Sequence, residues 1–310
     1  MNFDITVVGS CNTDFISYVP RMPSLGETIV GDKFEVGFGG KGANQCVMSS
    51  KLGAKVGMVA KVGDDVFGSQ TIDNFKSHQV DTRFVYIAEG VSSGVAPICV
   101  TPGGENTIVI IPGANNFLTT LEVDRAIEMI NVSKVLLCQL EIPPAVTLHA
   151  LKLARDRKVI TILNTAPAIP LFNEFYIYTD ILCMNESECK ALCGIMPDST
   201  DERSKAIIHF IRLGVACVIL TLGESGVVYG EKEDPKRIVS IPALVVKAVD
   251  TAGAGDAFVG ALAYFLACKQ ELPLEDKIMR STHIASLSVT RSGTQKSYQS
   301  KHELSSELFK

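Results

Sequence analysis

The chain has 310 residues, of which 46% are hydrophobic and 20% charged, and its formal net charge is −5. This length and composition predict one large or two modest folded domains and exclude a disordered or coiled-coil chain. The mild acidity disfavours nucleic acid or an anionic membrane surface as a partner, so any phosphate-binding site must be local.

The first predicted element is a short buried strand at about residues 4–9, a β-branched run that ends in a turn signal. Helices are predicted at about 42–52 and 67–79. The remaining early runs are extended, at 27–38, 84–88, 94–101 and 106–112. The last three form a hairpin-like series, and together the runs favour a small separate sheet.

Strands and helices alternate after residue 119. Thr119 followed by Glu122 is a capping-box signature for a helix that runs through Ile130. Continuous apolar runs, typical of parallel strands buried on both faces, occupy 134–140, 159–164, 180–184 and 217–221. Helical segments are predicted at 145–157, 186–193 and 202–213. The pattern predicts an α/β fold with a mostly parallel sheet, and the early extended runs form an inserted lid over one end of it.

The cysteines and the N-terminal residues indicate the cellular compartment. Nine cysteines are scattered mostly inside apolar runs, and none has partners at zinc spacing, so we expect reduced, buried thiols. The run MNFDITVVGS lacks the features of a secretory signal, which predicts a cytosolic protein. The apolar run at 257–268 is too short for a membrane span, which needs ~20 residues.

Polar residues follow several of the predicted strands. Asp14, Glu141, Asn185 and Thr221 each come zero to four residues after a strand, and a strand at 238–249 leads into a glycine turn. Because ligands of open α/β sheets lie outside the carboxyl ends of the strands, we expect these residues to face one crevice.

The glycine turn precedes an apolar helix at about 256–268. Gly253 and Gly255 allow a tight backbone in which the amides of residues 253–256 point at one spot, and the helix N-terminus adds positive potential. Asp256 is the unusual member, because a carboxylate repels phosphate whereas a base for an attacking hydroxyl must sit beside it. A helix cap is the alternative and explains this segment alone equally well.

Three glycines between residues 37 and 42 match G-x-G-x-x-G, but they do not follow the first strand, so a dehydrogenase is disfavoured. Lys41 lies in GGKG, which lacks the flanking residues of a Walker A loop. We interpret FGGKGANQ as a glycine approach to a helix whose early turn carries Asn44. The Asn44 amide donates and accepts, which suits vicinal hydroxyls, although a simple polar turn remains an alternative.

Two further motifs are ambiguous in isolation. In NESE, Asn185 and Glu188 share one face of an opening helical turn, and such oxygen ligands suit Mg²⁺. A capped helix with acids in its first turn is an equally good interpretation. TLGESG, at 221–226, is a strand end with a two-glycine turn that suits a nucleotide, although such turns are common. Asp14 and Glu141 are lone carboxylates, for which ordinary exposed loop positions are the alternative.

In this order the segments resemble the ribokinase family of sugar kinases, the PfkB-type carbohydrate kinases. DTAGAGD at 250–256 is the most specific motif, and the resemblance covers nearly the whole chain. The other motifs are NTD at 12–14, GGKGAN at 39–44, PGAN at 112–115, NESE at 185–188, TLGESG at 221–226 and SGTQKSY at 292–298. GGKGAN, PGAN and SGTQKSY are closer to the ribokinase subfamily than to adenosine, fructose or pseudouridine kinases. The resemblance implies one three-layer α/β/α domain over 1–310, with lid strands from about 15–40 and 84–113.

The resemblance implies that Asp256 is the general base in phosphorylation of D-ribose at O5 by ATP, giving ribose 5-phosphate. Amides of Gly253, Ala254 and Gly255 would form an anion hole, and Lys41 would act through its backbone. The sugar would be held by Asn12, Asp14, Gly40, Lys41, Gly42, Ala43, Asn44, Glu141 and Asp256. The ATP site would be lined by Asn185, Thr221, Leu222, Gly223, Glu224, Ser225, Gly226, Gly255 and Thr282.

Two cations and a homodimer are also implied. Asn185 and Glu188 would organise Mg²⁺ and its waters, and the lid strands would pair between subunits. K⁺ would order the glycine turn through ligands, largely carbonyls, from Asp250, Ala252, Ser288, Arg291, Gly293 and Ser297.

Three positions depart from the family pattern. Ala252 stands where threonine is common, which a backbone ligand tolerates. Arg291 replaces a small residue, and its charge would weaken K⁺ binding unless the side chain points away. Thr282 stands where asparagine often touches adenine. Two alternatives to ribose phosphorylation remain: a kinase for another pentose, deoxyribose or a nucleoside, and a catalytically silent sugar-binding regulator.

Overall fold

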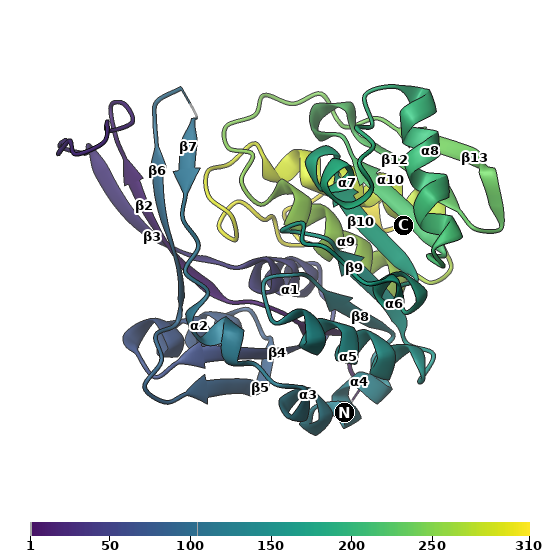
Figure 1. Cartoon of the computed structure of the whole chain (residues 1–310), viewed down its shortest axis with the longest axis horizontal. Coiled ribbons are helices and arrows are strands. Elements are labelled where there is room, and N and C mark those ends of the chain that lie inside the picture. Colours follow the sequence, from purple (N-terminus) through teal and green to yellow (C-terminus); the bar gives the residue numbers. More distant parts are fainter. Residues whose placement is uncertain (1, 104) are drawn as a thin grey trace.

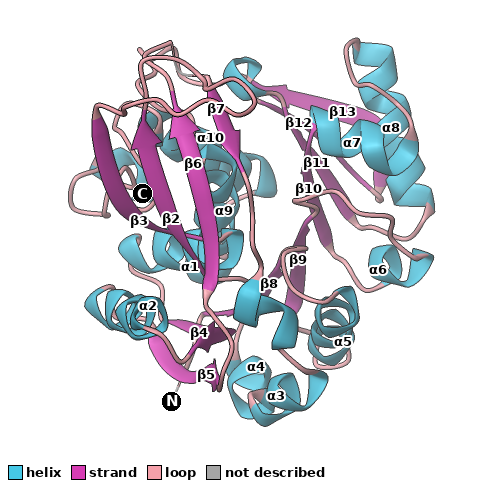
Figure 2. Ribbon diagram, turned by 60° about the vertical axis from the view of Figure 1, so that its left-hand side comes forward, coloured by secondary structure: helices cyan, strands magenta, loops and turns pink. Residues whose placement is uncertain are grey.

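The computed structural model describes residues 2–103 and 105–310, whose strands form two sheets (Figures 1 and 2). In the described residues the larger sheet has nine strands in the order β13-β12-β11-β10-β9-β8-β1-β4-β5. Strands β11 to β5 are parallel, whereas β12 and β13 are antiparallel. The bounds are β1 (Ile5–Val8), β4 (Val56–Gly63), β5 (Asp81–Ala88), β8 (Val135–Cys138), β9 (Ile160–Asn164), β10 (Ile181–Asn185), β11 (Cys217–Thr221), β12 (Val227–Glu231) and β13 (Asp234–Ile241).

The central strands are apolar throughout because both faces of the sheet are covered. Successive side chains of a strand point to opposite faces, so Ile5 and Val7 of β1 enter one hydrophobic cluster while Val8 enters the other. The first cluster includes the helices α1 (Lys41–Lys51), α2 (Val66–Ser77), α9 (Ala254–Cys268) and α10 (Leu274–Ser288). The second includes α3 (Thr120–Arg125), α4 (Ile127–Val132), α5 (Pro144–Arg155), α6 (Asn173–Ile177), α7 (Glu186–Cys193) and α8 (Thr200–Arg212).

This arrangement confirms the predicted three-layer α/β/α fold with a mostly parallel sheet. The capping box predicted for Thr119 and Glu122 is also confirmed, although the helix it starts is interrupted at Ala126 between α3 and α4. None of the helices in the described part of the chain combines the length and apolarity needed to cross a bilayer.

The smaller sheet stands apart from the helical layers at the upper left of Figure 1. Its strand order is β3-β2-β6-β7, with bounds Asn12–Tyr18 for β2, Lys33–Gly39 for β3, Gly94–Val100 for β6 and Asn106–Ile108 for β7. Because β2 begins four residues after β1 ends, the smaller sheet is attached at the carboxyl ends of the parallel strands. It therefore stands at the end of the large sheet where ligands of such folds bind.

Three predictions about the strands were wrong in whole or in part. Residues 84–88 belong to β5 and pair with β4 in the large sheet, because Val85 packs on one core cluster while Phe84 and Tyr86 pack on the other. The hairpin-like series is therefore only partly correct: β6 and β7 pair antiparallel, as expected for 94–101 and 106–112, but the run at 84–88 is not part of it, and β6 pairs in parallel with β2 on its other edge. The strand expected at 238–249 ends at Ile241, where Pro242 follows and supplies no N–H for the ladder.

Candidate active site

Asp256 lies in the first turn of α9, and its side chain is only 7% exposed. Two amides from α1 hold its carboxylate: Asn44 Nδ2 donates to Oδ2 at 3.0 Å and Gln45 Nε2 donates to Oδ1 at 2.8 Å. The carboxylate thus bonds to α1 rather than to an amide of its own helix, and the cap position is Gly253 without a side-chain cap. The helix-cap interpretation of Asp256 is therefore wrong.

The two glycines of the turn differ in structure. Gly253 has φ +76°, and a Cβ there would lie 2.7 Å from the Tyr298 hydroxyl, which donates to the Gly253 carbonyl at 3.0 Å. Gly255 is inside α9, and a Cβ there would meet nothing within 4 Å. Gly253 therefore shapes the turn, and Gly255 leaves open space beside the amides at the N-terminus of α9, where anions bind readily.

Asp14 and Glu141 come to the same region from β2 and the loop after β8. Glu141 Oε2 accepts from the Ser10 hydroxyl at 2.6 Å and from the Lys41 backbone amide at 2.9 Å. Burial, with the negative charges of Glu141 and Asp256, raises the pKa of Asp14 to about 7. The interpretation of Asp14 as an exposed loop carboxylate is wrong, since it is 8% exposed.

Asp14→Asn is expected to stabilise the ligand-free protein above pH 7. The folded-state pKa of Asp14, about 7 against an ordinary 3.8, means that the folded state binds more protons between these values, so stability falls as pH rises. Asparagine removes this effect, and the free energy of unfolding should rise by about 1–4 kcal/mol at pH 8 and far less at pH 4. Thermal unfolding across this range measures it; destabilisation at pH 8 would contradict it.

Lys41 contributes both its backbone and its side chain. Its backbone amide, the group expected to contact the sugar, donates to Glu141 Oε2 at 2.9 Å. Burial lowers the pKa of the ammonium group, but the charges of Asp256, Glu141 and Glu188 outweigh it and hold that pKa above its ordinary value. The ammonium therefore lies within electrostatic reach of three carboxylates, which the sequence interpretation did not anticipate.

The PGAN segment explains how Asn12 is held. Asn115 Oδ1 accepts from the Cys11 amide at 2.8 Å, and its Nδ2 donates to Asn12 Oδ1 at 2.8 Å. At the start of α1, Gly40 has φ +86° and a Cβ on Gly42 would lie 2.6 Å from the Ser10 amide nitrogen. Gly42 and the buried Ala43 thus serve the close approach of α1 to the β1–β2 link.

On the predicted nucleotide side, Asn185 and Glu188 form a reciprocal capping box at the start of α7. Asn185 Oδ1 accepts from the Glu188 amide at 2.8 Å, and Asn185 Nδ2 donates to Glu188 Oε1 at 3.0 Å. Burial raises the pKa of Glu188. The described residues contain no group of three or more His, Cys, Asp or Glu side chains suited to a metal ion.

The TLGESG turn follows β11. The Thr221 hydroxyl donates to the Met184 carbonyl at 3.3 Å, and the turn of Leu222, Gly223, Glu224 and Ser225 ends at Gly226, which has φ +92°. A Cβ on Gly226 would lie 2.1 Å from the Ile241 carbonyl, so this glycine permits contact with the end of β13. Thr282 is buried in α10, where its hydroxyl donates to the Ile278 carbonyl at 2.9 Å.

The predicted K⁺ ligands lie on two loops that Asp250 ties together. Asp250 Oδ1 accepts from the Ala252 amide at 2.9 Å and Oδ2 from the Gly293 amide at 2.8 Å. The Ser288 and Ser297 hydroxyls donate to the Ala285 and Thr294 carbonyls. The Arg291 guanidinium pairs with Glu303 at 2.9 Å.

The sequence interpretation missed the side chains behind Asp256 and Asn44. Gln295 Nε2 donates to Asn44 Oδ1 at 3.0 Å, and Gln45 bonds to Asp256, Asn164 and Gln139. Gln45 directly follows the GGKGAN motif and Gln295 lies inside SGTQKSY, so their position beside these motifs was the available signal.

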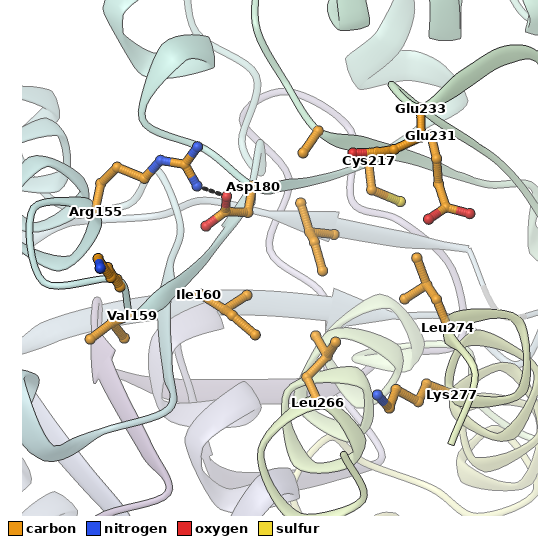
Figure 3. A pocket seen from close by; sticks show the side chains of 13 residues that line it. Arg155, Val159, Ile160, Asp180, Cys217, Glu231, Glu233, Leu266, Leu274 and Lys277 are labelled. Carbon is orange, nitrogen blue, oxygen red and sulfur yellow. Dashed lines mark ion pairs between the residues drawn. The ribbon is translucent and has the colours of Figure 1, made fainter. Parts of the chain in front are cut away.

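A cavity of about 590 Å³ lies elsewhere, at the amino ends of β9, β10 and β11 (Figure 3). An ion pair between Arg155 and Asp180 borders it, with Leu266 and Lys277 on another side. It contains none of the predicted site residues, which gather at the opposite, carboxyl ends of the strands.

Comparison with known proteins extends the motif-level resemblance to the whole chain. The family model described as pfkB family carbohydrate kinase matches residues 2–301. Ribokinase of Mus musculus is 46% identical, over 98% of this chain and 94% of the mouse protein, and deoxyribokinase of Salmonella typhi is 39% identical over 96% of each. The structure of Arabidopsis thaliana ribokinase complexed with ribose and ATP matches with a TM-score of 0.89, at 27% identity over 97% of each chain. This chain therefore belongs to the pfkB family of carbohydrate kinases.

Proposed function

We propose that this kinase transfers the γ-phosphoryl group of ATP to O5 of D-ribose, giving ribose 5-phosphate and ADP. The observation that carries the proposal is the buried Asp256 carboxylate, held by two amides of α1 at the N-terminus of α9. The similar mouse protein is named a ribokinase, and the similar Arabidopsis structure is described as complexed with ribose and ATP. These names support ribose as the acceptor.

In this mechanism Asp256 accepts the proton of the 5-hydroxyl as O5 attacks the γ-phosphorus. The new O5–P bond forms while the bond from phosphorus to the β,γ-bridging oxygen breaks, and ADP carries that electron pair away. Amides of Gly253, Ala254 and Gly255 stabilise charge on the phosphoryl oxygens, where preorganised donors act most strongly. The transition state is loose, so positioning dominates and the base contributes about 10²–10⁴-fold. The Lys41 ammonium adds positive charge near Asp256.

We assign the sugar hydroxyls to the polar groups that meet at the carboxyl ends of β1 and β8. Asp14, Glu141 and Asn44 supply side chains, and Gly40 and Lys41 supply backbone groups beside them. Asn12 is fixed by Asn115. Because Asn44 already bonds to Asp256, a sugar gripped by Asn44 lies next to the base.

The nucleotide is assigned to the opposite side, along Asn185 and the turn from Thr221 to Gly226. Mg²⁺ fits there through its waters, because each carboxylate oxygen of Glu188 accepts one hydrogen bond from Asn185 and keeps a second acceptor direction, and Mg²⁺ usually keeps several waters and binds phosphate. Asn185 holds that carboxylate in place. When bound, Mg²⁺ neutralises phosphate charge. The hydroxyl of Thr282 bonds within α10, so its methyl group is the part that would contact adenine.

K⁺ fits the two loops that Asp250 joins. Each oxygen of its carboxylate accepts one amide and keeps a second acceptor direction. The Arg291 guanidinium is engaged by Glu303, which removes the main objection to a cation there. Bound K⁺ would hold the turn at Gly253 in shape.

We further propose a single domain over 1–310, whose lid comprises β2, β3, β6 and β7, and a homodimer formed through this lid. Phe34, Val36 and Ile108 are exposed on these strands, and an exposed apolar sheet surface favours pairing. Sedimentation would show a monomer if the dimer proposal is wrong.

The nine free cysteines favour a reducing, cytoplasmic location, which cell fractionation tests.

A substrate panel tests the proposed acceptor. ADP release should be faster with D-ribose than with 2-deoxy-D-ribose or adenosine, and faster in K⁺ than in Na⁺. Deoxyribose is the second candidate because a relative at 39% identity is named a deoxyribokinase. A higher kcat/KM for deoxyribose would make deoxyribose the acceptor, and equal rates in Na⁺ and K⁺ would show that K⁺ is not a specific activator.

A further inference from the structure

Gln45 is a polar side chain in the middle of the core, with 0% of its surface exposed. It lies on α1 one residue after Asn44. A buried amide needs partners for all its polar groups. Gln45 has them: Nε2 donates to Asn164 Oδ1 at 2.9 Å and to Asp256 Oδ1 at 2.8 Å, while Oε1 accepts from Gln139 Nε2 at 2.6 Å.

These three bonds fix the direction of the Gln45 amide. Turning it over would place Oε1 against two acceptor oxygens, those of Asn164 and Asp256, and would leave the Gln139 donor facing another donor. Gly9 leaves room for Gln139, since a Cβ on Gly9 would lie 2.1 Å from Gln139 Oε1. Gln139 Oε1 has no hydrogen-bond partner in the described part of the chain. The Gln139 amide therefore donates to Gln45 although its own oxygen stays unpaired.

We propose that Gln45 is a positioning residue for phosphoryl transfer: its N–H fixes the Asp256 carboxylate in the direction that receives the proton of the sugar hydroxyl. This inference rests on the proposed function of Asp256. Consecutive residues of α1 hold the two carboxylate oxygens, Asn44 on Oδ2 and Gln45 on Oδ1. Each oxygen keeps one acceptor direction for the substrate proton.

The side-chain amides of Asn44 and Gln45 have different predicted roles. Asn44 is assigned to the sugar as well as to Asp256, so its loss would change both the KM for ribose and kcat. Gln45 has no exposed surface, and both N–H groups of its amide are already bonded to Asn164 and Asp256, so it makes no contact with the sugar. Loss of Gln45 should therefore reduce kcat and leave ribose binding unchanged.

The test compares the same substitution at two linked positions, Gln45→Met and Gln139→Met, because methionine keeps an unbranched chain of similar length. Gln45→Met should lower kcat by about 10- to 100-fold, by analogy with the loss of a partner that orients a metal ligand. The KM for D-ribose and its calorimetric Kd should stay within about threefold. Gln139→Met should retain kcat within about threefold, although it disturbs the same buried network.

A second variant, Gln45→Glu, keeps the shape and the acceptor for Gln139 but puts a carboxylate oxygen against Asp256. Its kcat should be lower still, and it decides the question if Gln45→Met does not fold. Folded Gln45 variants with wild-type kcat, equal losses in Gln45→Met and Gln139→Met, or a loss confined to the ribose KM would each overturn the inference. Wild-type protein without ribose-dependent ADP release would instead overturn the proposed function.

Discussion

Asp256→Asn is expected to lower kcat by about 10²–10⁴-fold, the usual contribution of a positioned general base, while D-ribose still binds. Asparagine keeps the size of the side chain and one acceptor oxygen, but its amide cannot take the proton of the 5-hydroxyl. Steady-state ADP release gives kcat, and calorimetry gives the ribose Kd.

The matched control is Asp276→Asn, which makes the same chemical change in the first turn of the neighbouring α10. It should leave kcat unchanged. Wild-type turnover by Asp256→Asn would remove Asp256 as the base. If the wild-type protein binds ribose but releases no ADP, the chain would instead be a silent sugar-binding regulator.

Gly253→Ala and Gly255→Ala are expected to have opposite effects on stability and similar effects on turnover. At Gly253, φ +76° and the Tyr298 hydroxyl 2.7 Å from the added Cβ should lower the free energy of unfolding by about 1–3 kcal/mol. At Gly255 the Cβ meets nothing and the residue is helical, so the ligand-free protein should be as stable or up to about 1 kcal/mol more stable. Both should lower kcat at least about tenfold, because both alter the phosphate turn.

Gly194→Ala separates backbone strain from the chemistry. Gly194 ends α7 with the same φ, +76°, and a Cβ there would meet nothing within 4 Å. This variant should lose about 1–2 kcal/mol of stability and keep full activity. Chemical denaturation and ADP release measure both quantities. If Gly255→Ala kept wild-type turnover, the open space beside it would not be the phosphate site.

Much of the large sheet was predictable because its central strands are covered on both faces. Continuous apolar runs identify β8 and β10 directly, since the packing that buries them imposes the pattern. The early strands were harder. The run at 84–88 is as extended as the lid strands, and only its two packed faces place it in the large sheet as β5. The local sequence of an edge strand does not determine which sheet the strand joins.

The parts of the site that lie within one short motif were predictable from the sequence. The parts that depend on contacts between residues distant in sequence were not. Asp256 and its glycine turn form one local segment, so their chemistry was visible in the sequence. The bond from Gln45 to Asp256 joins residues 211 positions apart, and the bond from Gln295 to Asn44 joins residues 251 apart. The first pair exists only once α1 and α9 have packed together, and the second only once the segment after α10 has packed on α1. The same holds for Arg291, whose pairing with Glu303 depends on the folded C-terminal segment.

³¹P NMR of a reaction containing the protein, ATP, Mg²⁺, K⁺ and D-ribose follows the transferred phosphoryl group itself. We expect the γ-phosphate signal of ATP to disappear while a phosphomonoester signal, split as expected for attachment to the C5 methylene, grows in step with ADP. Without ribose the ATP signals should remain. A mixture in which ATP persists, or in which it yields only inorganic phosphate, would show that this chain does not phosphorylate ribose.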